Sequence, residues 1–220
     1  IGVDEVGRGS LAGPVVLAAV AVPAKSKWLR AKGPLGQLRD SKKLSQGQRE
    51  RWTEYFKRQP GIAYAIARVY PRTIERLNIS RAANLAAMRA YGRLVAKRKS
   101  RIAGRGYIGR HATSDMRHAK IYLDGGLYLR SRKWQRASGR IRAKTVVKGD
   151  EKIPAVKVAS IIAKVWRDCL MKRLSRKYPK YGFEVHKGYG TRMHLRTLKK
   201  HGPSRAHRLT FLRFLQNSKR

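Results

Sequence analysis

The chain has 220 residues, of which 53 are Lys or Arg and 12 are Asp or Glu, so its formal net charge is +41. A chain of this length can bury one substantial core, and 42% apolar residues argue against disorder, so we expect a single folded unit. So much positive charge indicates a polyanionic partner. Nucleic acid is the first candidate because Lys and Arg displace counterions from phosphates, and an anionic membrane is the second.

The longest apolar run covers residues 15–22, which is far shorter than the roughly 20 residues that span a bilayer. No basic stretch followed by an apolar segment and a cleavage site is present at the start, so no signal peptide is predicted and we expect a cytoplasmic protein. The chain begins at Ile1 without Met, and we expect a trimmed start. The single Cys169 excludes an internal disulfide and a multi-cysteine zinc site.

The first half of the chain predicts strands and helices in alternation. Residues 1–5 and the apolar run 15–22 are typical of two strands around a turn rich in Gly and Pro. Ser45 predicts a cap for a helix over 46–58 with aromatic residues on one side. Alternating apolar residues predict a strand over 62–70, and apolar residues near helical spacing predict a core helix over 78–97.

The second half continues with strands and longer helices. Residues 100–120 are rich in Gly, Arg and His without periodicity and predict an exposed basic loop, followed by strands at 121–124 and 143–147. Val158, Ile162, Val165 and Cys169 share one face of a helix expected over 155–176, which predicts that Cys169 is buried. A helix over 191–201 ends at Gly202 and Pro203, and another is expected over 204–216. These elements together indicate an α/β fold with a sheet of mixed direction.

Four of the twelve acidic residues follow or end predicted strands. Asp4 and Glu5 close the first strand, Asp124 ends another before Gly125 and Gly126, and Asp150 follows the strand after it. Carboxylates at the ends of neighbouring strands can converge on a divalent cation such as Mg²⁺, and two such ions can promote phosphodiester cleavage. For any one acid in so basic a chain, however, the simpler interpretation is that it offsets nearby Lys and Arg.

Seven motifs, in sequence order, resemble the type 2 ribonuclease H family and cover nearly the whole chain. They are Asp4-Glu5-Val6-Gly7-Arg8-Gly9 with Leu11-Ala12-Gly13-Pro14; Asp40-Ser41-Lys42-Lys43-Leu44-Ser45; Leu77-Asn78-Ile79; Asp124-Gly125; Lys148-Gly149-Asp150; Ala159-Ser160-Ile161-Ile162-Ala163-Lys164-Val165 with Arg167-Asp168; and His186-Lys187-Gly188-Tyr189-Gly190-Thr191 with His194. One such motif could arise by chance, whereas the ordered set favours membership.

The resemblance implies a ribonuclease H-like mixed five-stranded sheet flanked by helices, with a helical C-terminal extension. It divides the chain into a catalytic domain over 1–176 and a substrate-binding segment over 177–220 that packs on it. It makes Asp4, Glu5, Asp124 and Asp150 the catalytic and metal-binding residues, holding two divalent ions, Mg²⁺ or Mn²⁺. The implied reaction cuts the RNA strand of RNA/DNA hybrids and the 5′ side of ribonucleotides embedded in DNA, leaving a 3′-hydroxyl and a 5′-phosphate.

The same resemblance assigns substrate-binding roles. Gly7, Arg8 and Gly9 match a backbone sensor of the ribose 2′-hydroxyl, and Tyr189 matches the tyrosine that works with it; such a sensor is chemically required, because the 2′-hydroxyl alone marks a ribonucleotide within DNA. Lys42 and Lys43 lie in a segment that the family uses near substrate. For any single Lys among 53 basic residues, a solvated charge is the simpler interpretation.

Other polar residues are expected to be structural. Asp168 follows Lys164 by four residues on a helix and predicts an ion pair with it. Asp40 is expected to form a turn. His186 and His194 lack the spacing of zinc ligands and are not assigned to a metal.

Two other function classes stay open at this point. The charge alone would suit a non-enzymatic basic nucleic-acid protein, although such a protein would not need aligned acids. A different nuclease or an integrase on the same fold would share the carboxylates without the glycine turn and Tyr189. We expect a monomer that acts on RNA/DNA hybrid and on DNA containing ribonucleotides, with no membrane association. The role of the basic segments 100–120 and 128–142 is open.

Overall fold

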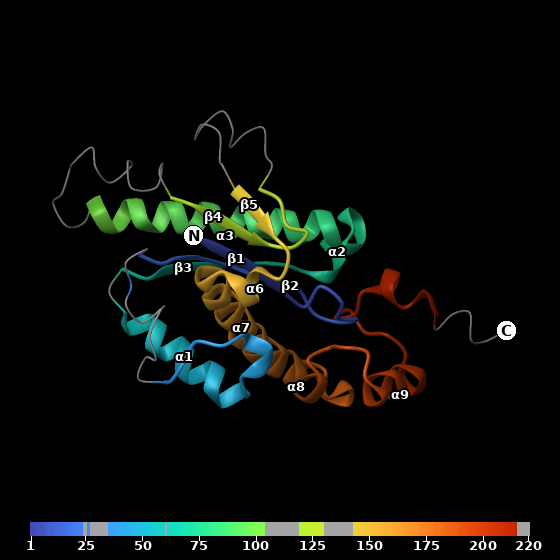
Figure 1. Cartoon of the computed structure of the whole chain (residues 1–220). Helices are drawn as coiled ribbons and strands as arrows, with labels where there is room; N and C mark the ends of the chain where they lie inside the picture. Colours follow the sequence, from blue (N-terminus) through green and yellow to red (C-terminus); the bar gives the residue numbers. More distant parts are fainter. Residues whose placement is uncertain (24–25, 27–34, 60, 104–118, 130–142, 215–220) are drawn as a thin grey trace.

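The computed structural model describes residues 1–23, 26, 35–59, 61–103, 119–129 and 143–214. Five strands form one sheet in the order β3-β2-β1-β4-β5 (Figure 1), and they are β1 (Gly2–Val6), β2 (Val15–Ala21), β3 (Ala63–Val69), β4 (Ile121–Asp124) and β5 (Ala143–Val146). β1 runs antiparallel to β2 and parallel to β4, while β2–β3 is antiparallel and β4–β5 parallel. The predicted mixed five-stranded sheet is therefore confirmed.

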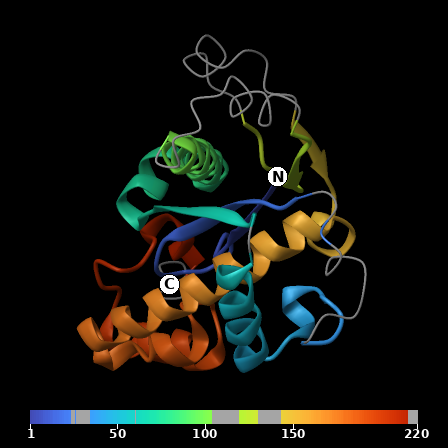
Figure 2. The same cartoon turned by 90° about the vertical axis from the view of Figure 1, so that its left-hand side faces the viewer.

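Helices cover both faces of the sheet (Figures 1 and 2). One face carries α2 (Pro71–Leu77) and α3 (Ile79–Ala103), and the other carries α1 (Gln46–Arg58) and α7 (Pro154–Lys177), with the short α6 (Gly149–Lys152) leading into α7. Ser45 caps α1 with a capping box, as its sequence predicts. α2 was not predicted; Pro71 at its first turn begins it directly after β3.

Small residues let the helices approach the sheet closely. Five alanines of α3 are fully buried against β1, β2 and β3, namely Ala82, Ala83, Ala86, Ala87 and Ala90. On the other face, α7 packs so closely on β1 that a Cβ on Gly2 would lie 2.1 Å from the carbonyl carbon of Ala155. The tight contact holds the start of β1, and with it the acidic residues further along that strand.

The C-terminal part packs around the far end of α7. It comprises the 3₁₀ turn η3 (Pro179–Tyr181), α8 (Phe183–His186), α9 (Arg192–His201) and the 3₁₀ turn η4 (Leu209–Phe211). Buried residues here form a third apolar cluster around Met171 and Phe183. The division of the chain at residue 176 stays a prediction.

The prediction of a helix over 204–216 is wrong for the residues described, which end at 214. Residues 204–208 lead as an irregular segment into the short η4. The backbone groups of this segment are taken by the β1–β2 connection: the amide of Gly13 donates to the carbonyl of Ala206 at 2.8 Å, and the amide of Arg208 donates to the carbonyl of Leu11 at 2.8 Å. Backbone groups used in this way cannot complete a helix.

The prediction that Cys169 is buried is also wrong, because its side chain is exposed. The first half of α7 packs on β1 and β2, and its second half packs on α8 and η3 from another side. The buried face therefore changes along the helix and includes Arg167, Asp168 and Met171. Asp168 forms its ion pair with Arg49, at 3.7 Å, rather than with Lys164.

Two predicted basic segments lie largely outside the described residues. The basic loop expected over 100–120 begins with helix, since α3 continues to Ala103, and residues 104–118 are not described. Of the segment 128–142, only 128 and 129 are described. Within the described part of the chain, none of the helices combines the length and apolar character needed to cross a membrane.

Candidate active site

The parallel strands at the centre of the sheet bring acidic residues together. Asp4 and Glu5 lie within β1, and Asp124 is the last residue of the adjacent β4. Because Val3 pairs with Leu123 in parallel register, Asp4 lies next to Asp124 across the two strands. Carboxylate oxygens of Asp4, Glu5 and Asp124 all lie within 4.8 Å of one another. The predicted convergence of these three residues is thus found in the structure.

Asp150 joins this region from α6. Asp150 is 3% exposed, and its Oδ2 accepts a hydrogen bond from Lys42 Nζ at 2.9 Å. The preceding Gly149 links it to the cluster, because the Gly149 amide donates to Asp124 Oδ1 at 2.7 Å. Asp150 is outside the group of three whose oxygens lie within 4.8 Å, but it lines the same cavity.

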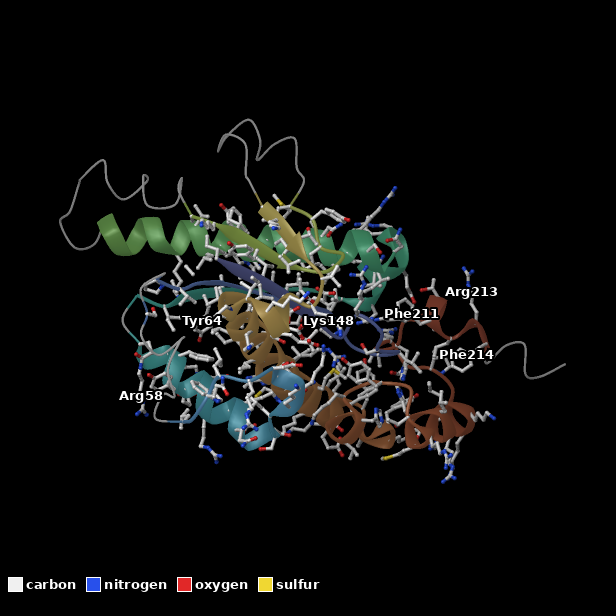
Figure 3. All side chains as sticks on the ribbon, viewed as in Figure 1. Arg58, Tyr64, Lys148, Phe211, Arg213 and Phe214 are labelled. Atoms are coloured by element: carbon white, nitrogen blue, oxygen red, sulfur yellow. The ribbon has the colours of Figure 1, made fainter. Side chains whose placement is uncertain are left out.

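A cavity of about 260 Å³ contains nearly all the residues assigned to the site. The four acids line it together with residues 6–9, Lys42 and Tyr189, and so do Ser41, Ser160 and Lys164. Lys43 is exposed and lies outside this lining, so the structure does not bring it to the site. Figure 3 labels Lys148, in the turn between β5 and α6 that carries Asp150 into the site.

Burial makes the negative charge of this cluster costly. The pKa of Asp4 is raised well above its usual value, first by burial and then by repulsion from Glu5. The pKa of Glu5 is raised as well, mainly by burial, against the lowering effect of Arg8, whose Nη1 donates to Glu5 Oε1 at 3.3 Å. The cluster therefore favours any partner that neutralises it, either protons or a cation.

The donor set fits a hard divalent cation. Glu5 Oε2 is buried and has no hydrogen-bond partner among the described residues. Carboxylate oxygens are the ligands that Mg²⁺ and Mn²⁺ take in proteins, and an unpartnered buried oxygen is costly unless something binds it. Asp4, Glu5 and Asp124 would hold such an ion, with Asp150 beside them.

The turn after β1 forms one wall of the cavity. Gly7 has φ +81°, and a Cβ there would lie 2.2 Å from Arg167 Nε, so glycine is required for both its conformation and its close contact. Gly9 has open space where a Cβ would stand. A ligand can therefore approach the backbone of this turn at Gly9.

Tyr189 lines the same cavity as this turn. Its side chain is 37% exposed, and its ring lies over the Arg167 guanidinium at 5.4 Å. The stacking fixes one face of the ring and leaves part of the side chain open to the cavity.

Ser160 and Lys164 are among the cavity-lining residues that were not predicted from the sequence. Ser160 hydrogen-bonds to the Asp4 carboxylate and also pairs with Ser41 Oγ at 2.8 Å. Lys164 lies on the same helix, and burial together with repulsion from Arg49 lowers its pKa. Their i, i+4 spacing on α7 was the available signal, since it places both on one helix face.

The remaining polar predictions concern structural residues. Asp40 caps the 3₁₀ helix η2 (Ser41–Lys43), where its Oδ1 accepts from the Lys42 amide at 2.9 Å, as a turn-forming residue would. His186 and His194 are buried and hydrogen-bond to carbonyl oxygens, and neither belongs to the acidic group.

The mixed sheet and the acidic cavity at its centre define a metal-dependent nuclease with a ribonuclease H-like fold. The family model described as ribonuclease HII matches residues 1–214. The chain is 38% identical over 212 residues to a ribonuclease HII of Nitrosospira multiformis, covering 96% of this chain and 87% of the relative. It is 40% identical over 210 residues to one of Thiobacillus denitrificans, covering 96% and 85%.

A solved structure agrees with these relatives. The RNase HII in a complex with PCNA from Archaeoglobus fulgidus superposes with a TM-score of 0.66 at 26% identity, over 94% of this chain and 92% of that chain. The chain belongs to the ribonuclease HII family. It is accordingly a nuclease with ribonuclease H activity that depends on divalent metal ions.

Proposed function

We propose that the chain is an endonuclease that hydrolyses the RNA strand of RNA/DNA hybrids and cuts duplex DNA on the 5′ side of an embedded ribonucleotide. The observation that carries the proposal is the group of three carboxylates within 4.8 Å, one oxygen of which is buried and unpartnered, in the same cavity as the glycine turn and Tyr189. An acidic centre beside a turn with accessible backbone suits both the cleavage of a phosphodiester and the recognition of a ribose.

Asp4, Glu5, Asp124 and Asp150 are the proposed catalytic ligands of two divalent ions, Mg²⁺ or Mn²⁺. Two such ions, when bound, would supply activation of the attacking water and stabilisation of the leaving 3′-oxygen, which would give a 3′-hydroxyl and a 5′-phosphate. The chain's own part is to hold four oxygen donors in place and to surround them with cations. Lys42 is the proposed phosphate contact, because its ammonium already faces Asp150 and its side chain is 69% exposed.

Recognition of ribose is assigned to Gly7, Arg8, Gly9 and Tyr189. The backbone of the turn is open at Gly9, where a 2′-hydroxyl could exchange hydrogen bonds with it. Tyr189 supplies a ring and a hydroxyl to the same cavity. Lys43 is proposed only as a more distant contact to the backbone of the nucleic acid, since it is exposed outside the cavity.

Three duplexes of one base sequence test the proposal: all DNA, DNA with one ribonucleotide, and RNA paired with DNA. With Mg²⁺ or Mn²⁺, we expect a single cut 5′ to the ribonucleotide, cuts along the hybrid strand, and no cut in the all-DNA duplex. Cutting of the all-DNA duplex would favour the alternative nuclease or integrase function, and no cutting with either ion would refute the proposal.

The site assignment is tested by Asp4→Asn, with Glu184→Gln as an exposed acid outside the cavity for the control. Asp4→Asn should abolish cleavage while the melting temperature without metal stays equal or rises, because a buried charge that costs stability is removed. Mn²⁺ should raise the melting temperature of the native chain and of Glu184→Gln more than that of Asp4→Asn. Full activity of Asp4→Asn would contradict the assignment.

A further inference from the structure

Two consecutive residues of the C-terminal segment, His207 and Arg208, are buried behind the proposed ribose sensor, and they are 3% and 0% exposed. Figure 1 shows this segment beside the turn that joins β1 and β2. An isolated antiparallel bridge pairs Ala12 with His207, and Phe211, labelled in Figure 3, follows three residues after Arg208 and lies against its guanidinium at 5.3 Å. The segment is thus anchored to the sensor turn by its backbone.

Arg208 holds the carbonyl groups of the turn. Its Nη1 donates to the carbonyl of Arg8 at 2.8 Å, its Nη2 donates to the carbonyls of Gly7 at 2.7 Å and Gly13 at 2.9 Å, and its Nε donates to Gly13 at 3.0 Å. Only a guanidinium offers enough donors in one plane to hold three carbonyls at once.

These contacts orient the other side of the same peptide groups. In a trans peptide, the C=O of one residue and the N–H of the next point in opposite directions. With the carbonyls of Gly7 and Arg8 directed at Arg208, the amides of Arg8 and Gly9 face away from it. Residues 7–9 line the cavity, so the orientation of these amides determines which hydrogen-bond donors they offer to a ligand there.

His207 reaches the other half of the sensor through His194. The Ser204 amide donates to His207 Nδ1 at 2.9 Å, so the proton of a neutral His207 is on Nε2. That nitrogen lies 3.0 Å from His194 Nε2, which must accept, and His194 Nδ1 then donates to the carbonyl of Tyr189 at 2.8 Å. One tautomer of each ring satisfies the whole chain of hydrogen bonds.

We propose that His207 and Arg208 are positioning residues for ribose recognition: the C-terminal segment sets the placement of the glycine turn and of Tyr189 relative to each other. The inference rests on the proposed function of that sensor and adds to it the residues that determine its selectivity. Neither residue lines the cavity, so both act through the groups that they hold. The chemistry selected is a ribonucleotide 2′-hydroxyl within a DNA duplex.

The test uses Arg208→Lys, which keeps the positive charge but loses the planar set of guanidinium N–H donors. Arg205→Lys is the matched control, because Arg205 is exposed in the same segment. Leu198→Ala serves as a second control, because Leu198 belongs to the C-terminal core cluster and does not line the cavity, so the variant reports what loss of core packing alone does. For each variant, the melting temperature and the kcat and KM are measured on the duplex with one ribonucleotide.

Selectivity is measured separately as the ratio of two dissociation constants with metal chelated, one for the all-DNA duplex and one for the duplex with one ribonucleotide. We expect Arg208→Lys to lower kcat/KM by about tenfold to a hundredfold, because a misplacement of about 1 Å has effects of this size. Its ratio of dissociation constants should fall to about one, while both controls keep the native ratio.

A pair of His207 variants tests the hydrogen bonds that run from His207 through His194 to the carbonyl of Tyr189. His207→Gln retains an N–H where Nε2 stood and should keep most of the selectivity, whereas His207→Leu should lose it. Native selectivity in both Arg208→Lys and His207→Leu, or losses in them no larger than in Leu198→Ala, would overturn the inference. A native chain that binds both duplexes equally and cuts neither would instead refute the proposed function.

Discussion

Acid should unfold this chain through a buried pair of histidines. Burial is the largest cause that lowers the pKa of His194 and of His207 to about 4, and repulsion from a neighbouring imidazole adds to it. An unfolded histidine titrates near 6.5, so the unfolded chain binds more protons between these two values. The stability that the neutral rings contribute is complete above about pH 6.5 and is lost as the pH falls towards about 4.

The magnitude follows from the shift. A folded pKa of about 4 against 6.5 removes about 2 kcal/mol of stability per histidine between about pH 7.5 and about pH 5. Because the two rings share one hydrogen bond, the pair together loses between about 2 and 4 kcal/mol rather than a strict sum. For a chain of this size, 2 kcal/mol corresponds to a fall of about 4 to 8 °C in melting temperature.

Urea unfolding at several pH values measures this loss, and His207→Gln isolates it. The variant cannot titrate at this position. Over the same pH range, its loss of unfolding free energy should therefore be smaller than that of the native chain, and the difference between the two losses should be about 2 kcal/mol. Acidic residues that titrate in this range contribute to both chains and cancel in the difference. His201→Gln, at an exposed position, is the matched control for the substitution. A native-minus-variant difference that does not change with pH would refute the reasoning.

Three further outcomes follow from individual contacts. Gly2→Ala should destabilise the chain by about 3 kcal/mol or more in urea unfolding, because a Cβ would lie 2.1 Å from the backbone of Ala155; a change below about 0.5 kcal/mol would contradict the close packing. Lys42→Ala should lower the melting temperature, because it leaves the buried carboxylate of Asp150 without its ammonium partner, and it should also raise KM; an unchanged KM would contradict its role. Binding to duplex should weaken steeply with salt in a log–log titration, and a flat line would contradict a phosphate-dominated interface.

The sequence predicted the parts of the fold that carry a clear local signal. β2 is an unbroken apolar run buried on both faces, and α1 has a cap at its expected position, so both have nearly the expected bounds. Asp4 and Asp124 could be placed together because parallel strands end at one edge of a sheet. That the two residues are adjacent depends on the strand order and the register, which the sequence did not specify.

Sequence patterns did not predict the buried cations. Arg167 and Arg208 are fully buried, and among the described residues neither makes an ion pair with a carboxylate; their partners are carbonyl and hydroxyl oxygens of the β1–β2 turn. In a chain with 53 Lys and Arg, composition gives no means of selecting two that are buried. The exposure of Cys169 has the same origin, because α7 buries one face against the sheet and a different face against the C-terminal part.

Arg8 connects the acidic cluster with the buried cations. Its side chain donates to Glu5 Oε1 at 3.3 Å, and its carbonyl accepts from Arg208 Nη1 at 2.8 Å. On one side of this residue, burial is the main cause that raises the pKa values of Asp4 and Glu5, and repulsion between carboxylates adds to it. On the other side, burial and the neighbouring Arg167 lower the pKa of Arg208 to about 9, which leaves it a cation at neutral pH. Arg208 therefore fixes the backbone of the turn from one side, while the side chain of Arg8 reaches the acidic cluster on the other.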